Sequence, residues 1–461
     1  MIKAKDIDVD SRTIFLLVVI VGITFLTGIF ITKVSTGTAF FIIAALIISI
    51  ASFLNAEVAL YVLIISMLFS PEFIVGDIAG KAALGRGITL RFDDILLVII
   101  GFSWFLKTAI KKELGLFLRT PLNRPIAYYF SACIVATLVG VMMGRVEGLT
   151  GFFFVLKYFE YFIIYFMVAN HLREKRQIER FIIVMLIVCL VVCLIAIFQI
   201  PAGGRVSAPF EGEVGEPNTL GGYLILMLSI VLGLLLTYGS KKQKGLFAIL
   251  VFFIVVSLLA TLSRSSWLAL GPMLLALIYF SKRKIVIVVP LILMLLLSPF
   301  VLPSSVKERA LFTFTQPQER GQIEIGGFRI DTSASARITS WKNVLTKDFI
   351  THPILGHGVT GYHFLDAQYP RVLVETGLVG FAFFIWLLVA VFKNALYTYR
   401  NTSDPLFSGL CLGYLAGFAA MIAHAVGANT FIIVRIMEPF WFLTAIIIMI
   451  PTIEADPRTK A

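Results

Sequence analysis

Charged side chains that could do chemistry occur in a few short stretches of an otherwise apolar sequence. Arg205 lies in GGRVSAPFEGEVGEPNTLGGYL, Arg264 lies in TLSRSSWLAL, and Arg337 follows in a long polar segment. A guanidinium group donates two parallel hydrogen bonds to phosphate oxygens and keeps its positive charge. Each arginine alone is also explained as an interfacial residue that reaches lipid headgroups. Taken together, the three are candidates for a shared anion-binding site.

The residues beside these arginines are typical of helix starts. Asn218 or Thr219 can cap a helix that opens near Pro217, and Ser265 and Ser266 stand at the start of another. A helix N-terminus offers free N–H groups and a positive dipole end to a phosphate. Asn218 and Ser265 are therefore candidate substrate-binding residues, although ordinary capping explains the same pattern.

A further stretch, THPILGHGVTGYHFLDAQYPRVLVETGLVG, contains His352, His357, His363 and Asp366. An imidazole, or a carboxylate whose pKa is raised by burial, can act as a general base near neutral pH. The spacing of the histidines in this glycine-rich stretch matches no compact zinc pattern, so we predict no metal site. His363 and Asp366 are the candidate catalytic residues.

Two charge pairs fall inside apolar runs. Lys157 and Glu160 are three residues apart in KYFEYF, and Arg435 and Glu438 have the same spacing near the C-terminus. Charges inside a membrane are normally paired or face a cavity. A structural pair on one helix explains both cases, and ion coupling in a transporter is the alternative.

The elements that must position these side chains are membrane-spanning helices. Of the 461 residues, 59% are hydrophobic and 14% are charged, whereas soluble domains have roughly 45–50% and about 25%. This composition excludes a soluble enzyme, a disordered scaffold and a secreted disulfide-rich domain. We predict an all-α polytopic bundle of about 12–14 spans. The candidate spans lie near 14–32, 38–54, 56–70, 93–110, 125–143, 152–170, 181–200, 218–238, 246–262, 265–280, 285–302, 371–392, 405–425 and 430–451.

The distribution of Lys and Arg predicts the orientation. If both termini are cytoplasmic, every short cytoplasmic segment is basic, and these segments hold roughly three times as many Lys and Arg as the short outer loops, as the positive-inside rule expects. The net charge of +12 therefore reports topology, and we expect no nucleic-acid partner. The long segment 303–370 then lies outside the membrane on the extracytoplasmic side.

These features divide the chain into four parts. Residues 1–204 form the N-terminal spans, 205–302 the central spans with the anion-site candidates, 303–370 the long outer loop, and 371–461 the C-terminal spans. The apolar residues Ile338, Trp341 and Leu345 have helical spacing. We therefore expect the long loop to be an ordered cap.

In their order and spacing, these motifs resemble a known superfamily. The segments SRSSWLALG, THPILGHGVTGYHF and LVETGLVGFAFF are similar to those of the O-antigen ligase and O-antigen or exopolysaccharide polymerase superfamily, which are bacterial polytopic membrane glycosyltransferases. The upstream GEPNTLGGYL is similar to a Pro-Asn segment that these proteins carry. The resemblance covers about residues 205–392, and the N-terminal spans agree only in being apolar.

The resemblance implies a glycosyltransferase of the bacterial inner membrane that acts at the outer face on a glycan carried by undecaprenyl diphosphate. It implies no metal, no other cofactor and no nucleotide sugar. It assigns the donor diphosphate to Arg205 and Arg264 and, more weakly, to Arg337. The implied partners are the lipid-linked donor, an acceptor glycan, the bilayer, a flippase and a chain-length regulator.

One departure from the family pattern bears on the reaction. Ligases have a His-Asn pair about nine residues before the Glu of E-x-G-L-x-G, and this chain has Asp366 and Ala367 in that place before Glu375. Polymerase-like members often have Asp there, so a polymerase is favoured over a ligase. The general base remains open between Asp366 and His363. A transporter of lipid-linked glycans is the third alternative, although the halves show no internal repeat.

Overall fold

The computed structural model describes residues 47, 50, 51, 55–76, 88–91, 93–98, 100, 101, 118–211, 215–325 and 327–455. The chain divides into two compact units, Met1–Val62 and Leu63–Ala461. In the first unit the described residues are helical apart from Asn55, and the arrangement below concerns the second. The predicted span at 14–32, and most of those at 38–54 and 93–110, lie outside the described residues.

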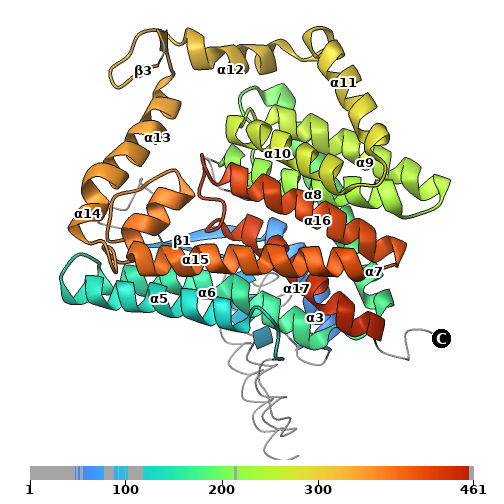
Figure 1. Ribbon diagram of the computed structural model, residues 1–461, viewed down its shortest axis with the longest axis horizontal. Helices are drawn as coiled ribbons and strands as arrows, with labels where there is room; N and C mark the ends of the chain where they lie inside the picture. Colours follow the sequence, from blue (N-terminus) through green and yellow to red (C-terminus); the bar gives the residue numbers. More distant parts are fainter. Residues whose placement is uncertain are drawn as a thin grey trace, which may run out of the picture. The chain divides into compact units, whose positions relative to one another are not determined.

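Helices make up 78% of the structure, which confirms an all-α polytopic bundle (Figure 1). Nine of the described helices are long and apolar enough to cross a membrane, and α3 (Ala56–Phe69) and α10 (Arg264–Phe280) are shorter. The nine are α5 (Asn123–Met142), α6 (Gly148–His171), α7 (Lys175–Gln199) with the 3-10 turn η1 (Ile200–Ala202), α8 (Pro217–Thr237), α9 (Lys241–Ala260), α11 (Lys284–Val301), α15 (Gln368–Asn401), α16 (Pro405–His424) and α17 (Val434–Ala455). Every predicted span from 125–143 onward therefore has its helix.

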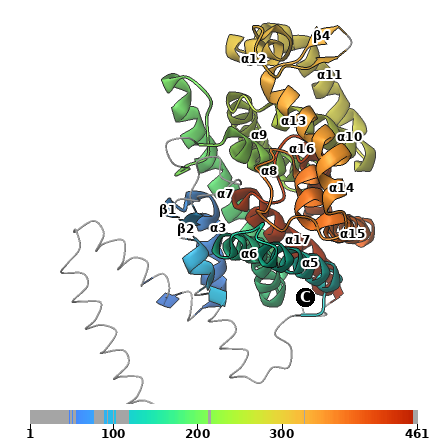
Figure 2. The same cartoon turned by 90° about the vertical axis from the view of Figure 1, so that its left-hand side faces the viewer.

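Helix α8 lies in the core, and 16 of its 21 residues are buried. It packs against α16, which runs beside it in both views (Figures 1 and 2). Glycines allow this close approach: a Cβ atom at Gly233 would lie 2.3 Å from the carbonyl oxygen of Gly409, and one at Gly413 would lie 2.6 Å from that of Ser229. Two backbones in such contact leave no room to shift against each other.

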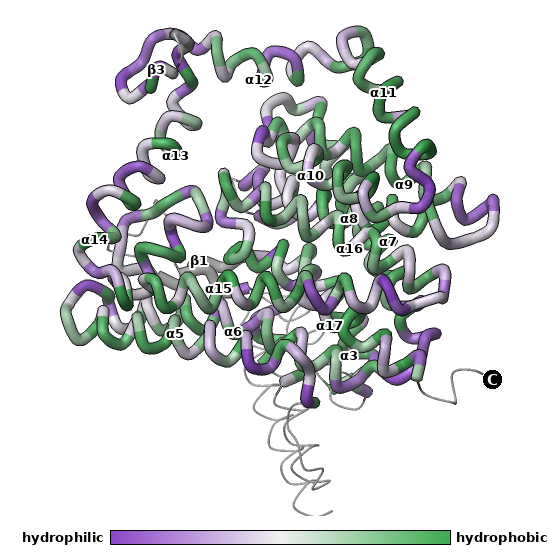
Figure 3. Tube along the Cα trace, viewed as in Figure 1, coloured by the Kyte–Doolittle hydropathy of each residue, from purple (hydrophilic) through white to green (hydrophobic). Residues whose placement is uncertain are grey.

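Helix α11 has the opposite environment, since none of its residues is buried. Figure 3 shows it as hydrophobic along most of its length. An apolar helix that is exposed all round is what a lipid environment requires. From its end the chain enters the long loop.

The long loop contains regular structure, in agreement with an ordered cap. It begins with α12 (Ser304–Thr315), continues through a small antiparallel hairpin of β3 (Glu324–Ile325) and β4 (Phe328–Arg329), and returns along α13 (Thr332–Asn343) (Figure 1). The π-helical turn η2 (Val344–Asp348) and α14 (Phe349–Thr351) follow. The other described hairpin pairs β1 (Glu72–Gly76) with β2 (Ile88–Arg91).

Backbone hydrogen bonds fasten the end of the long loop to the start of α15. The amide of Gly358 donates to the carbonyl of Glu375 at 2.8 Å, and that of Leu378 donates to the carbonyl of Pro353 at 2.8 Å. Between Glu375 and Leu378, helix α15 is kinked at Gly377, which has φ 66° and ψ −169°. That conformation is essentially restricted to glycine. The glycine-rich motif residues therefore fix the loop in place.

Candidate functional site

The site is built on the corner where α9 ends and α10 begins. Ser263 caps α10 by accepting a hydrogen bond from the amide of Ser266, and its hydroxyl donates to Asn218 Oδ1 of α8 at 2.7 Å. A Cβ atom at Gly221 would lie 2.1 Å from Ser266 Oγ. The corner thus holds the N-termini of α8 and α10 side by side.

The candidate residues Asn218 and Ser265 lie at these helix starts, but neither is a cap. Helix α8 begins at Pro217 with Glu216 in the cap position, because proline is favoured at the first helical residue. The expectation that Asn218 or Thr219 caps α8 is therefore wrong. Ser265 donates to the carbonyl of Gly427 at 3.2 Å, which joins α10 to the turn after α16.

Arg264 is held by the long loop. Its two terminal nitrogens lie 2.5 and 2.8 Å from the two carboxylate oxygens of Asp331, and Nη1 also donates to Thr313 Oγ1 at 2.7 Å. Asp331 in turn caps α13. Burial alone would raise the pKa of Asp331, but hydrogen bonds from Arg264 and from the α13 amides outweigh it and lower that pKa. Asp331 therefore stays ionised and ties the loop to α10.

Arg337 is held by the candidate base. Its Nη2 lies 2.6 Å from Asp366 Oδ2, and its Nη1 donates to Ser333 Oγ at 3.1 Å. Burial raises the pKa of Asp366, and the positive charges of Arg337 and Arg371 oppose this rise without cancelling it. The Asp366 side chain is still 39% exposed. It is thus a partly accessible carboxylate whose pKa is shifted toward neutral pH.

Arg205 and Arg309 complete what we call the arginine cluster, defined as Arg205, Arg264, Arg309 and Arg337. Arg205 Nε donates to the carbonyl of Thr261 at 3.1 Å. Burial, followed by repulsion from the other three arginines, lowers the pKa of Arg205 to about 10. Sequence reasoning missed Arg309, because nothing in its spacing separates it from the other cations of the long loop.

Asp366 joins the arginine cluster, whereas His363 does not. His363 is exposed, and its ring lies against that of Tyr362, with the ring centroids 3.9 Å apart. The rings of His352 and His357 meet edge to face with centroids 4.5 Å apart, and His357 Nδ1 is 3.2 Å from the carbonyl of Val374. The histidines of this stretch thus pack beside the loop's attachment to α15.

A buried histidine that sequence reasoning missed contacts the start of α10. His424, at the end of α16, places Nε2 3.1 Å from Ser266 Oγ and Nδ1 2.8 Å from Thr430 Oγ1. All three side chains are buried. A lone histidine at the end of a predicted span was the available signal.

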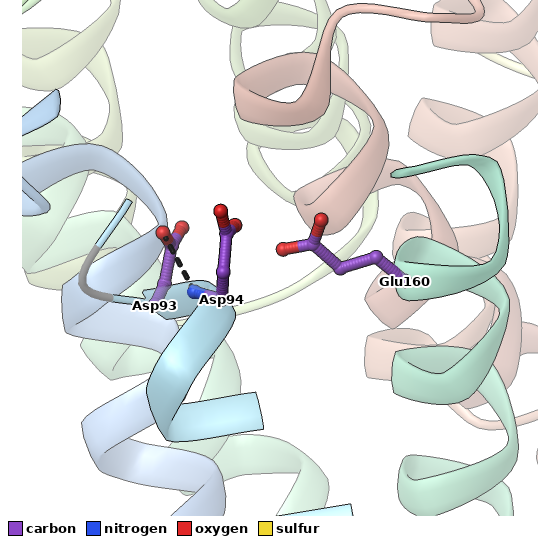
Figure 4. Close-up of side chains that lie close together, drawn as sticks. All are labelled: Asp93, Asp94 and Glu160. Carbon is purple, nitrogen blue, oxygen red and sulfur yellow. Dashed lines mark hydrogen bonds between the residues drawn. The ribbon is translucent and has the colours of Figure 1, made fainter. Parts of the chain in front are cut away.

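A second charged region, the acidic cluster, is defined as Asp93, Asp94, Glu160 and Glu438 with the cations Arg91 and Lys157. One carboxylate oxygen from each of Asp93, Asp94 and Glu160 lies within 4.8 Å of the others (Figure 4). Three such oxygens could hold a cation, but the Lys157 ammonium group already contacts Asp94 and lies 3.4 Å from Glu160. The lysine therefore supplies the positive charge at that position.

The two predicted same-helix pairs have different outcomes. Lys157 and Glu160 do form an ion pair. Glu438, however, lies 3.5 Å from Arg91, and Arg435 donates to the carbonyls of Leu68 and Ser70, both at 3.1 Å. The predicted pairing of Arg435 with Glu438 was wrong, because the guanidinium group binds backbone carbonyls of other segments instead.

Fold and site together define a multi-pass membrane protein with a basic site formed by helix starts and a long ordered loop. Residues 248–385 match the family model described as O-Antigen ligase. This match confirms the resemblance to the O-antigen ligase and polymerase superfamily and indicates a membrane enzyme of the glycosyl-transfer type. No curated protein matches the chain. The matched segment contains Arg264, Arg309, Arg337 and Asp366.

Proposed function

We propose that this protein polymerises a cell-surface polysaccharide, either O-antigen or exopolysaccharide, from glycan units carried on undecaprenyl diphosphate. The observation that carries this proposal is the joining of Asp366 to the arginine cluster through Arg337 at 2.6 Å. A general base and a set of phosphate-binding cations are the two parts that such a transfer needs. Asn218 and Arg264 lie at the starts of α8 and α10, where helix dipoles also favour an anion.

The bond changes follow from this arrangement. A hydroxyl group of the acceptor sugar attacks the anomeric carbon of the donor and loses its proton to Asp366. The bond between that carbon and the diphosphate oxygen breaks, and its electron pair stays on the diphosphate. Fixed guanidinium groups stabilise the charge that develops there. Because arginines supply this positive charge, the proposed reaction uses no metal.

The choice of a polymerase over a ligase depends on Asp366, which stands where ligases have a histidine. A ligase remains the second candidate, because the matching family model is described as O-Antigen ligase. Both reactions share the donor and differ in the acceptor, which is a growing glycan in one case and a lipid core or a protein in the other.

The transporter alternative has less support. It depended on Lys157 with Glu160 and on Arg435 with Glu438 as coupling groups. Lys157 and Glu160 belong to the acidic cluster, and Arg435 is bound by backbone carbonyls, so neither cation needs a transported ion as its partner.

The proposed location is the bacterial inner membrane, with cytoplasmic termini and with residues 303–370 on the periplasmic side. The basic cytoplasmic loops support this orientation. The proposed partners are the lipid-linked donor, the acceptor glycan, the bilayer, a flippase that delivers the donor and a chain-length regulator.

The test is to incubate the purified protein in proteoliposomes with a lipid-linked repeat unit and to separate the products on a gel. A ladder of lengthened glycans supports the polymerase. A single product on an added lipid core or protein supports the ligase. Movement of the donor across the membrane without any new glycosidic bond would overturn the enzyme proposal.

A further inference from the structure

The four arginines of the cluster differ in their ionic partners. Arg264 is paired with Asp331, and Arg337 is paired with Asp366. Arg205 and Arg309 form no ion pair with any carboxylate of the described residues. The positive charge available to a ligand is therefore concentrated on these two.

Arg309 faces the site because of its place on α12. It precedes Thr313 by four residues, which puts both side chains on the same face of the helix. Thr313 Oγ1 accepts the hydrogen bond from Arg264 Nη1 at 2.7 Å, and the Thr313 carbonyl accepts one from the Asp331 amide at 2.9 Å. The face of α12 that carries Arg309 is thus the one docked at the α10 corner.

Arg309 has a hydrogen-bond donor that no described residue accepts. Its Nε is buried and has no hydrogen-bond partner among the described residues, and its guanidinium carbon lies 5.7 Å from the centre of the Phe312 ring. A buried donor without an acceptor is costly, since the protein loses the hydrogen bond that water would supply. An anion bound at this place would supply an acceptor.

The other side of the corner holds Arg205. Its Nε is anchored to the carbonyl of Thr261, three residues before Arg264. Burial and repulsion by the neighbouring arginines lower the pKa of both Arg205 and Arg309, and Glu216 opposes this only in part at Arg205. Cations that repel each other are stabilised when a multivalent anion binds between them.

We propose that Arg309 binds the diphosphate of the lipid-linked donor together with Arg205. Arg264 and Arg337 are already engaged by Asp331 and Asp366, and they hold the long loop against the corner. This inference depends on the proposed function, because it names a further residue for the same donor. It assigns to the long loop a direct contact with the leaving group.

The experiment measures binding to the purified full-length protein in nanodiscs with undecaprenyl diphosphate as the probe. Hydrogen bonds to charged groups contribute about 1.5–3 kcal/mol, so Arg309→Ala should weaken the affinity roughly 10- to 150-fold. Arg205→Ala should have an effect of similar size. Arg309→Lys should fall between wild type and Arg309→Ala, because lysine keeps the charge but loses the planar fork.

Arg320→Ala is the matched control, because Arg320 is an exposed arginine of the same loop outside the cluster. Substitutions at such positions change free energies by no more than about 0.5 kcal/mol, so its affinity should stay within about threefold of wild type. If Arg309→Ala binds undecaprenyl diphosphate as tightly as Arg320→Ala does, the proposal is overturned.

Two further probes separate the source of the anion. Undecaprenyl monophosphate and phosphatidylglycerol each present one phosphate group, and the proposal expects both to bind more weakly than the diphosphate and to depend less on Arg309. If phosphatidylglycerol shows the same affinity and the same dependence on Arg309, then the residue is a headgroup contact and the proposal is overturned. If wild type shows no preference for undecaprenyl diphosphate at all, the proposed function fails as well, whereas loss of the Arg309 effect alone leaves it standing.

Discussion

The arginine cluster and the acidic cluster carry opposite excesses of formal charge in different surroundings. The first has four arginines and two paired carboxylates, Asp331 and Asp366, and the Asp366 side chain is 39% exposed. The second has four carboxylates and two cations, and its members Asp93 and Glu438 are 0% exposed.

The difference lies in what each region leaves unpaired. In the arginine cluster, the guanidinium groups of Arg205 and Arg309 have no carboxylate partner among the described residues, and the cluster is partly exposed. In the acidic cluster, the cluster's own cations contact its carboxylates, and Arg91 contacts both Asp93 and Glu438. Buried ion pairs between segments hold those segments together, whereas an accessible excess of one charge favours a ligand of the other. We therefore propose that the first region carries the chemistry and that the second has a structural role.

The largest effect is expected at the base. Asp366→Asn should lower the turnover of lipid-linked donor by about 10²–10⁴-fold, the range typical of a lost general base. His363→Gln should change turnover by no more than about threefold, because substitutions of exposed side chains change free energies by about 0.5 kcal/mol at most. Initial rates of glycan transfer measure both variants. The opposite order would move the base to His363.

The next effect concerns stability and the acidic cluster. Arg91→Gln leaves Asp93 and Glu438 without their cation, and breaking a buried pair in this way costs about 3–5 kcal/mol. Thermal unfolding in detergent should show a clearly lower midpoint. The control is Lys175→Gln, which breaks the more exposed pair with Asp404 and should cost at most about 1 kcal/mol. Equal midpoints for the two variants would mean that the acidic cluster does not hold the fold.

A smaller effect is expected at the kink that fastens the long loop. Gly377→Ala places a Cβ atom 2.3 Å from the carbonyl oxygen of Ile354 in a conformation that alanine avoids, at a cost of order 1–3 kcal/mol. Limited proteolysis should cut residues 303–370 faster. Gly271→Ala, in α10 with open space around it, should leave the rate unchanged, and equal rates in the two variants would contradict the fastening role.

The smallest effect is a shift in pH dependence. The pKa of Asp366 is raised by burial and held back by Arg337, so Arg337→Gln should raise it further. A base works only when deprotonated, so the acid limb of the kcat/KM profile should move to higher pH. A profile that keeps its acid limb in place would show that Asp366 is not the titrating base.

The sequence predicted the helices well and the contacts between charges poorly. Long apolar runs determine spans directly, so α5 through α11, α16 and α17 were expected close to their true bounds, whereas α15 continues to Asn401, beyond the expected end at residue 392. The placement of Arg264, Arg337 and Asp366 in one site could also be expected from family motifs. The partner of Arg264 could not, because Asp331 is 67 residues further along the chain and only the fold brings them together.

Arg309 and His424 show the same limit. One is an ordinary loop cation by sequence, and the other is a single histidine at the end of a span. Their roles depend on which face of α12 docks and on how α16 meets α10. The predicted pairing of Arg435 with Glu438 was wrong for a related reason. Glu438 is close in sequence, but folding brings backbone carbonyls to the Arg435 guanidinium group instead.

The glycine contacts between α8 and α16 have a consequence for the rate of the reaction. In the proposed reaction, negative charge moves onto the diphosphate as the glycosidic bond breaks, within a single barrier crossing. If the surrounding protein were flexible, its dipoles would have to reorient during that time. The free energy of this reorientation would add to the activation free energy. Gly233 and Gly413 hold α8 closely against its neighbour, so under this proposal the dipole at the α8 N-terminus is fixed before the substrate arrives.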